Sequence, residues 1–170
     1  MSIADQDREN QHQFAAATTA EMTEIVLPND SNVLGNILGG KVMHLIDIAA
    51  AIAAARHCSR PVVTVSVDYL EFRHPIKVGE LIIVRAALNR VFRTSMEIGA
   101  KVWSENLSTG NRIHTSSAYL TFVALDADSK PTAVSPYSPV TETEKRRWRE
   151  AEVRRANRLQ VKQRIATLDE

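Results

Sequence analysis

The chain has 170 residues, 44% of them hydrophobic, and this length and composition predict one globular domain with its own core. Lys and Arg number 21 against 20 Asp and Glu, so the charge balance requires neither a nucleic acid nor an anionic membrane as partner. A single cysteine excludes an internal disulfide framework and a multi-cysteine metal site, and it fits a reducing compartment.

The N-terminal residues, 1–17, are polar and carry little apolar periodicity, so we expect a flexible arm there. They lack the basic start and apolar centre of a signal peptide. The longest strongly apolar run, 48–55, is far shorter than the roughly 20 residues of a membrane span. We therefore expect a soluble, cytoplasmic protein without membrane insertion.

A domain over 18–127 is predicted from six segments of regular structure. A short strand over 19–27 ends at Pro28, and an alanine-rich apolar helix runs from Gly40 to about His57 and is buried on most sides. Four β-rich segments follow at 60–72, 80–92, 94–106 and 111–125. Because short connections join consecutive strands, we expect an α+β fold in which one antiparallel sheet covers one long helix.

The C-terminal part of the chain divides into an extended connector, 128–140, rich in Pro and Ser, and a basic helix, 141–170. Thr141, with Glu144 three residues later, forms a capping-box pattern at the helix start. We expect most of the helix's Lys and Arg side chains to be solvated, with Trp148 and Leu159 packed against the body. A minority remain candidates for contact with ligand phosphates.

The stretch GNILGGKV, 35–42, matches seven of the eight positions of the phosphate-binding loop G-x-x-x-x-G-K-[ST]. Val42 replaces the hydroxyl residue that binds magnesium, no buried strand precedes the loop, and the predicted sheet is antiparallel, so a nucleotide hydrolase is disfavoured. What remains is a pair of glycines, Gly39 and Gly40, at a helix N-terminus. Unpaired amides and the helix dipole favour an anion there, or a carbonyl oxygen that becomes one.

Asp47 is the one acidic residue within 45–55, where every other residue is apolar. A lone buried carboxylate costs free energy unless it is paired or neutralised. Two interpretations stay open: a local pair with His44 or Lys41, or a functional acid, because such groups concentrate at active sites. Asn32, in the loop before the helix, is by itself equally consistent with a loop or capping role.

Other candidate nucleophiles and bases have less support. Cys58 lies between Arg56 and Arg60, but no nucleophile signature surrounds it, which favours a structural thiol. His44 is a secondary candidate base, since a lone helical histidine is more often packed or partnered. Neither G-x-S-x-G nor H-E-x-x-H occurs, so serine hydrolases and zinc proteases have no motif support.

Four motifs together resemble the acyl-coenzyme A thioester hydrolases of the hotdog fold, specifically the group with the cytosolic brain-type acyl-CoA hydrolase and the YciA-like bacterial thioesterases. They are N-x-x-G-x-x-x-GG from Asn32, an Asp seven residues after Gly40, V-T-V-x-V-D over 63–68 and T-S-M over 94–96. The resemblance extends from about Met22 to the terminal helix. It implies a helix wrapped by a five-stranded antiparallel sheet, homodimers that join their sheets, and trimers of dimers.

The resemblance also implies a reaction, the hydrolysis of fatty acyl-CoA to free fatty acid and coenzyme A, at sites on the dimer interface. Asp47 matches the catalytic acid, as general base on water or as nucleophile, and Asn32 matches a catalytic residue supplied by the opposite subunit. Gly39 and Gly40 would donate amide hydrogens to the oxyanion. The resemblance implies neither a metal ion nor a bound cofactor.

Further residues are expected to bind the substrate. They are Thr64 and Ser95 for the thioester pocket, and Arg56, Arg73 and Arg93 for the phosphates of coenzyme A. Leu38 stands where the family commonly has Phe or His, and Arg93 stands where it often has Gly. The resemblance therefore indicates the reaction more strongly than it indicates the acyl specificity. Two other functions stay open: a hotdog module that binds acyl-CoA without turnover, as a sensor or regulatory subunit, and a hydratase acting on enoyl-CoA.

Overall fold

The computed structural model describes residues 18–167, so the predicted arm over 1–17 and the last three residues lie outside the described part. Five strands surround the core helix. The elements are β1 (Thr19–Ile25), η1 (Pro28–Asp30), α2 (Gly39–Cys58), β2 (Val62–Phe72), β3 (Leu81–Val91), β4 (Ser95–Glu105), β5 (Arg112–Ala124) and α3 (Glu142–Ala166). Within this range, neither α2 nor α3 is long and apolar enough to cross a membrane.

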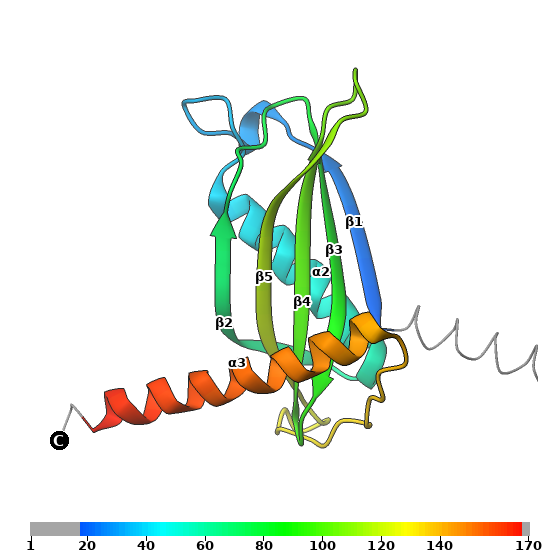
Figure 1. The fold of residues 1–170 in the computed structure, drawn as a ribbon, viewed down its shortest axis with the longest axis vertical. Helices are drawn as coiled ribbons and strands as arrows, with labels where there is room; N and C mark the ends of the chain where they lie inside the picture. Colours follow the sequence, from blue (N-terminus) through cyan, green and yellow to red (C-terminus); the bar gives the residue numbers. More distant parts are fainter. Residues whose placement is uncertain (1–17, 168–170) are drawn as a thin grey trace, which may run out of the picture.

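The strands form one sheet in the order β1-β3-β4-β5-β2, and every neighbouring pair is antiparallel, as predicted. The first strand ends two residues earlier than predicted, because its partner β3 begins only at Leu81, after a turn in which the N–H of Glu80 donates to the carbonyl of Lys77 (3.1 Å). After β1, at one edge of the sheet, the chain passes over one face of the sheet as α2 and then forms β2 at the opposite edge (Figure 1). β2 pairs only with β5, so its second edge is open within the described chain.

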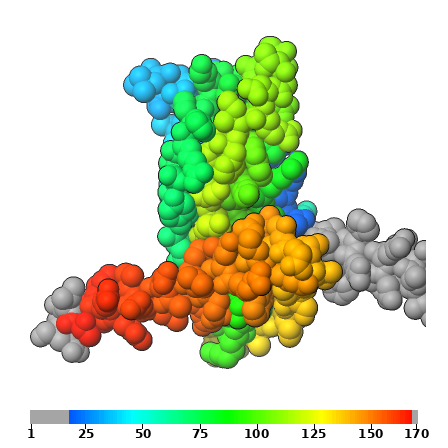
Figure 2. Space-filling view, viewed as in Figure 1, coloured from blue at the N-terminus to red at the C-terminus, as the bar shows by residue number. Residues whose placement is uncertain are grey.

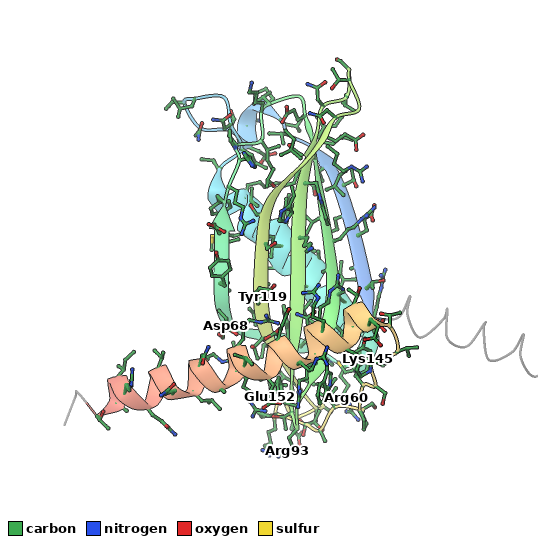
Figure 3. The ribbon with its side chains drawn as sticks, in the orientation of Figure 1. Arg60, Asp68, Arg93, Tyr119, Lys145 and Glu152 are labelled. Atoms are coloured by element: carbon green, nitrogen blue, oxygen red, sulfur yellow. The ribbon has the colours of Figure 1, made fainter. Side chains whose placement is uncertain are left out.

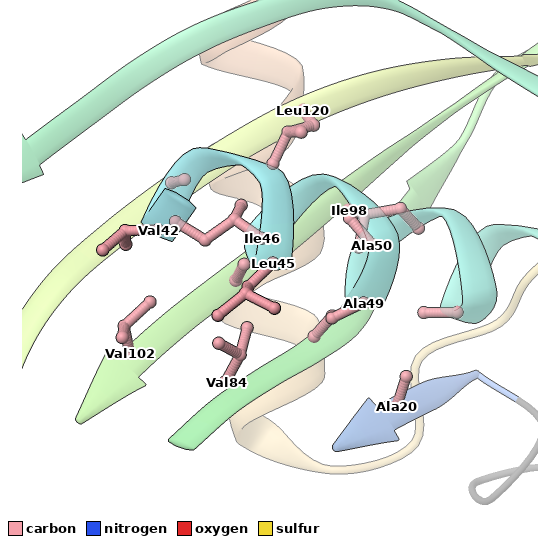
Figure 4. Packing of buried hydrophobic residues seen from close by; sticks show 14 of the residues in the cluster. Ala20, Val42, Leu45, Ile46, Ala49, Ala50, Val84, Ile98, Val102 and Leu120 are labelled. Atoms are coloured by element: carbon pink, nitrogen blue, oxygen red, sulfur yellow. The ribbon is translucent and has the colours of Figure 1, made fainter. Parts of the chain in front are cut away.

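Helix α2 packs in the concave face of the sheet, which confirms the wrapped-helix arrangement. Its buried side chains meet those of the strands in one core; Figure 4 shows Leu45 and Ile46 among Val84, Ile98 and Leu120. Four alanines of the helix, at 49, 50, 53 and 54, have no exposed surface. Their small size lets the helix lie close against the strands, where larger residues would overpack the core.

Successive side chains of β4 point alternately to the two faces of the sheet. Met96, Ile98, Ala100 and Val102 are buried against α2, so the residues between them point to the opposite face. Helix α3 crosses that opposite face (Figures 1 and 2). It starts at the predicted capping box, in which the side chains of Thr141 and Glu144 each accept a backbone N–H of the other.

Two charged residues dock α3 onto the sheet, although most of its Lys and Arg side chains are exposed as expected. Arg154 Nη2 donates to Oε1 of Glu97 (2.6 Å), a carboxylate only 1% exposed. Arg158 pairs with Asp68 on β2. Half-buried Trp148 packs against the body as expected, but Leu159 is 48% exposed, because α3 runs on past the β2 edge (Figure 1).

Candidate active site

The loop before α2 is held by one side chain and one glycine. The Oδ1 atom of Asn32 accepts hydrogen bonds from the backbone N–H groups of Leu34 (2.9 Å) and Asn36 (3.2 Å). Gly35 adopts a φ of +74°, the left-handed region that favours glycine. The loop therefore uses the carbonyl side of the Asn32 amide, and its NH₂ group remains as the side-chain donor.

The N-terminus of α2 is uncapped by any side chain. Leu38 is the N-cap residue and has no polar group to bond the first amides, and Gly39 and Gly40 are exposed. A Cβ on Gly40 would meet no atom within 4 Å, and one on Gly39 would lie 3.5 Å from the ring of Phe72. Within the described chain the backbone of this turn is thus open to an approaching ligand. Its unpaired N–H groups and the helix dipole favour a negatively charged atom.

Asp47 lies two turns further along α2 and is half buried. Its Oδ1 accepts a hydrogen bond of 2.6 Å from Oγ1 of Thr64, which comes from β2. The local pair with Lys41 is wrong, because that ammonium pairs with Glu24 (3.4 Å) and Asp30 (3.7 Å) instead. The structure thus brings together two of the predicted site residues, 17 positions apart in the sequence.

A cavity of about 310 Å³ opens beside Asp47, between α2 and the strands β2 and β5. Apart from the carboxylate and His44, its lining is apolar: Gly40, Met43, Ile46, Val67, Leu70, Ala118 and Leu120. These apolar residues were not predicted as site residues, because hydrophobic side chains carry no chemical signature in the sequence. The cavity places the carboxylate and the glycine end of α2 at the edge of a space that suits a short hydrocarbon chain.

Comparison with known proteins decides the family. Residues 34–110 match the model of the Thioesterase superfamily. The chain is 40% identical over 134 residues to the protein VdlD of Helicobacter pylori, covering 79% of this chain and 76% of that protein. It is also 40% identical over 131 residues to the uncharacterized acyl-CoA thioester hydrolase YkhA of Bacillus subtilis, covering 77% and 76%. The chain belongs to the thioesterase superfamily.

Solved structures share the fold of this thioesterase. An apo-hexameric acyl-CoA thioesterase superposes with a TM-score of 0.83 at 40% identity, over 86% of this chain and 94% of that one. An acyl-CoA hydrolase from Staphylococcus aureus, in complex with butyryl coenzyme A, coenzyme A and coenzyme A disulfide, gives a TM-score of 0.81 at 31% identity, over 92% and 98%. The hotdog arrangement is therefore confirmed along nearly the whole described chain.

Arg73 and its neighbours form a polar group on the exposed end of β2 in this thioesterase. Glu71 Oε2 accepts hydrogen bonds of 2.8 Å from Nε of Arg73 and from the hydroxyl of Tyr69. The bond from Arg73 holds the pKa of Glu71 below its ordinary value, and the carboxylate in turn raises the pKa of Tyr69. Arg73 follows Phe72, whose ring faces Gly39, so it lies at the glycine end of α2.

The other predicted substrate residues lie away from Asp47 within one chain. Ser95 alternates with Met96 and so belongs to the α3 face of the sheet. Arg93 lies in the turn between β3 and β4, at the lower end of the molecule in Figure 3. Arg56 is nine residues, about 13 Å, further along α2, where its Nη1 donates to the carbonyl oxygen of Thr19 (2.6 Å). Their contact with substrate stays a prediction.

Asn32 and Asp47 are joined by no hydrogen bond within residues 18–167. Asp47 is linked to β2 through Thr64, whereas Asn32 bonds within the loop that leads into α2. Their predicted cooperation across two subunits stays a prediction.

Proposed function

We propose that this thioesterase hydrolyses acyl-CoA to a free fatty acid and coenzyme A, with Asp47 as its reactive carboxylate. The observation that carries the proposal is the Thr64–Asp47 hydrogen bond at the mouth of an apolar cavity, beside the uncapped glycine turn of α2. This arrangement offers a carboxylate held in one orientation, donors for an oxyanion and space for an acyl chain. These are the groups that thioester hydrolysis requires.

The reaction has two balanced routes on this geometry. As general base, Asp47 takes a proton from water while the water oxygen bonds to the thioester carbon; the C–S bond then breaks and the sulfur receives the proton. As nucleophile, Asp47 bonds to the same carbon and displaces the thiolate, which is protonated by solvent, and water then hydrolyses the anhydride. On both routes the amides of Gly39 and Gly40 stabilise the oxyanion. Neither route needs a metal ion or a bound cofactor.

The relatives support these assignments. Structures of the Staphylococcus aureus acyl-CoA hydrolase include separate variants in which an Asn, an Asp and a Thr are replaced by Ala. Those three positions are separated by 15 and 17 residues, the same intervals that separate Asn32, Asp47 and Thr64 in this chain. The spacing fits one site built from the loop, from α2 and from β2.

A second subunit fits the open edge of β2. Val65 is 54% exposed there, Val67 and Tyr69 are nearly half exposed, and the backbone of this edge has no neighbouring strand in the described chain. Such an edge is a ready template for another strand. Because Val67 also lines the cavity, a subunit joined at β2 would cover the cavity mouth and could supply Asn32. We propose a homodimer that assembles further as a trimer of dimers, in line with the hexameric relatives.

The mechanism is tested by thiol release from a series of acyl-CoA substrates. Asp47→Asn keeps the shape of the side chain and is expected to lower kcat by at least about a thousand-fold, because no base or nucleophile of equal strength remains. Sedimentation should show the oligomer intact. If the variant turns over at the wild-type rate, the role of Asp47 is refuted. If the wild-type protein binds acyl-CoA of every length without thiol release, the chain is a binding module.

The shared site is tested by mixing two inactive variants, Asn32→Ala and Asp47→Ala. If each site combines Asn32 of one subunit with Asp47 of the other, a mixed dimer contains one site with both groups intact. Random exchange of subunits should then restore about a quarter of the wild-type activity. No recovery after verified exchange would place both groups in the same subunit. Asp47→Ala mixed with Asp47→Asn is the control, because it cannot restore any site.

Acyl length is proposed to be set by the cavity beside Asp47. Ala118 and Leu70 lie on its walls, so Ala118→Leu reduces the space and Leu70→Ala enlarges it. The first variant should move the optimum of kcat/KM to shorter acyl chains and the second to longer ones. Identical chain-length profiles for both variants would show that the acyl chain lies elsewhere.

A further inference from the structure

Strand β2, which carries the hydrogen-bond donor to the reactive carboxylate, is irregular. Its pairing with β5 shifts register twice within residues 64–69. At each shift β2 has one residue more than β5, first Val65 and then Asp68. Such β-bulges bend a strand and change the direction in which its side chains point. Which face each side chain of this part of β2 meets therefore depends on the bulges.

The first bulge aims Thr64 at Asp47. In a regular strand alternate residues line one face, so Thr64 and Ser66 would point the same way. Instead Thr64 lies opposite Phe122, which is buried in the core against α2. Ser66 lies opposite Thr121, which bonds to a side chain of α3 on the other face of the sheet. The extra residue between them thus lets Thr64 meet Asp47 while Ser66 faces α3.

A network on the α3 side holds both bulges. Oδ1 of Asp68 accepts a hydrogen bond of 2.5 Å from Oγ of Ser66, and Oδ2 pairs with Nη1 of Arg158. The same Nη1 donates to Oγ1 of Thr121 on β5 (2.9 Å). Figure 3 shows Asp68 where α3 passes β2. One guanidinium of α3 is therefore tied to both strands at the place where their register shifts.

Burial makes this network stronger than an ion pair on the surface. The Asp68 side chain is 10% exposed, that of Arg158 is 26% exposed, and Thr121 is buried. Water and salt screen such a contact less than they screen a pair of exposed charges. Without Arg158 the carboxylate would lack its cation, and a movement of β2 toward solvent would relieve that cost. The strand is free to move, because its second edge has no neighbouring strand in the described chain.

The docking of α3 does not depend on this network alone. Arg154 joins the helix to Glu97 on β4. Among the ion pairs of residues 18–167, the pair of Arg158 with Asp68 is the one that joins α3 to β2. The contact on β4 can therefore be altered without touching β2, which provides a matched control.

We propose that Arg158 and Asp68 are positioning residues for the hydrolysis. Their ion pair keeps β2 in the bulged register that aims Thr64 at Asp47. Helix α3 then contributes to the reaction from the outer face of the sheet, without touching the substrate. The inference rests on the proposed function, because it requires that Asp47 act on the thioester. A change on the outer face should alter turnover and leave substrate affinity nearly unchanged.

Steady-state kinetics of the full chain test this role. Arg158→Met keeps the aliphatic part of the side chain but removes its charge, and should lower kcat for a butyryl thioester of coenzyme A about five-fold, with KM within about two-fold. Arg158→Lys restores the charge and should recover most of that loss. In the control Arg154→Met, which loosens α3 on β4, kcat should stay within about two-fold. Equal falls in Arg158→Met and Arg154→Met would show a general effect of α3 docking and overturn the proposal.

A double-variant cycle tests the path through Thr64. Without the Thr64 hydroxyl the ion pair has no donor to position, so adding Arg158→Met to Thr64→Val should change kcat by less than about two-fold. If the two losses multiply instead, Arg158 acts by another route and the proposal is wrong. Ser66→Ala removes a single hydrogen bond of the network, and the same cycle with this milder variant decides the question if Arg158→Met does not fold.

Hydrogen exchange separates this inference from the proposed function. In Arg158→Met the backbone amides of 64–69 should exchange at least about ten-fold faster than in the wild type, while those of β3 stay unchanged. If the wild type releases no thiol from any acyl-CoA, the proposed function fails and the positioning role fails with it. If the wild type is active, but Arg158→Met changes neither kcat nor the exchange of β2, only the positioning role is refuted.

Discussion

The hydrogen bond from Thr64 to Asp47 gives the sharpest test of the proposed mechanism. Thr64→Val preserves the shape of the side chain but removes the donor of the 2.6 Å bond. A hydrogen bond to a charged group contributes about 1.5–3 kcal/mol. Because Thr64 is exposed in the single chain and Asp47 only half buried, water can replace part of it, and we expect the lower limit. That corresponds to a roughly ten-fold fall in kcat.

The assay is steady-state thiol release with a butyryl thioester of coenzyme A, from which kcat and KM are obtained separately. KM should stay nearly constant, because Thr64 is proposed to act through Asp47 as a positioning residue. Thr64→Ser keeps the donor and should recover most of the lost rate. Thr23→Val, at an exposed position of β1, is the matched control. If Thr64→Val and Thr23→Val have the same kcat, the hydrogen bond does not orient the carboxylate and the reasoning is refuted.

Three further predictions concern stability, each measured by urea unfolding. Arg154→Met leaves the buried Glu97 carboxylate without its cation and should lower the free energy of unfolding by about 3 kcal/mol. The control Arg149→Met, at an exposed position of α3, should change it by less than about 0.5 kcal/mol. Equal effects of the two variants would mean that the ion pair does not dock α3. Gly35→Ala places a Cβ at a φ of +74° and should cost about 1 kcal/mol, so a gain in stability would contradict the strain argument. Burial raises the pKa of Tyr137 from 10.0 to about 12, so this tyrosine ionises at a lower pH in the unfolded chain than in the folded one. The free energy of unfolding should therefore fall as the pH rises from 10 to 12. Tyr137→Phe should remove this fall, and an unchanged pH profile in the variant would contradict the prediction.

Local patterns predicted the elements of this protein because they depend on neighbours in the sequence. Thr141 and Glu144 form a capping box with atoms only three residues apart, and the structure contains it as predicted. The long apolar helix and the β-rich segments were likewise visible as periodicity and composition. The end of β1 was missed because it depends on where its partner β3 begins, after a turn at Lys77–Glu80 in another part of the chain.

The ion pairs between α3 and the sheet were not predicted from the sequence. A basic helix with scattered apolar residues has the same pattern whether its charges are solvated or paired. Arg154 and Arg158 are paired with Glu97 and Asp68, which come from strands more than fifty residues earlier. Leu159, expected to pack, is exposed instead. Nothing in the sequence near α3 indicates which strand passes beneath it, so its ion pairs with the sheet were not predictable.

For the candidate site, the sequence by itself determined the residue types and their spacing: Asn32, the glycine pair and the one acid of an apolar helix. Those features are local, since the unpaired amides of a helix start and the positions of side chains along a helix follow from the backbone geometry of that segment alone. Only the tertiary structure decided the partner of Asp47, because Thr64 reaches the carboxylate through the order of the strands, which brings β2 alongside α2. Sheet order depends on which distant segments bury each other's surfaces, and no short stretch of this chain contains that information.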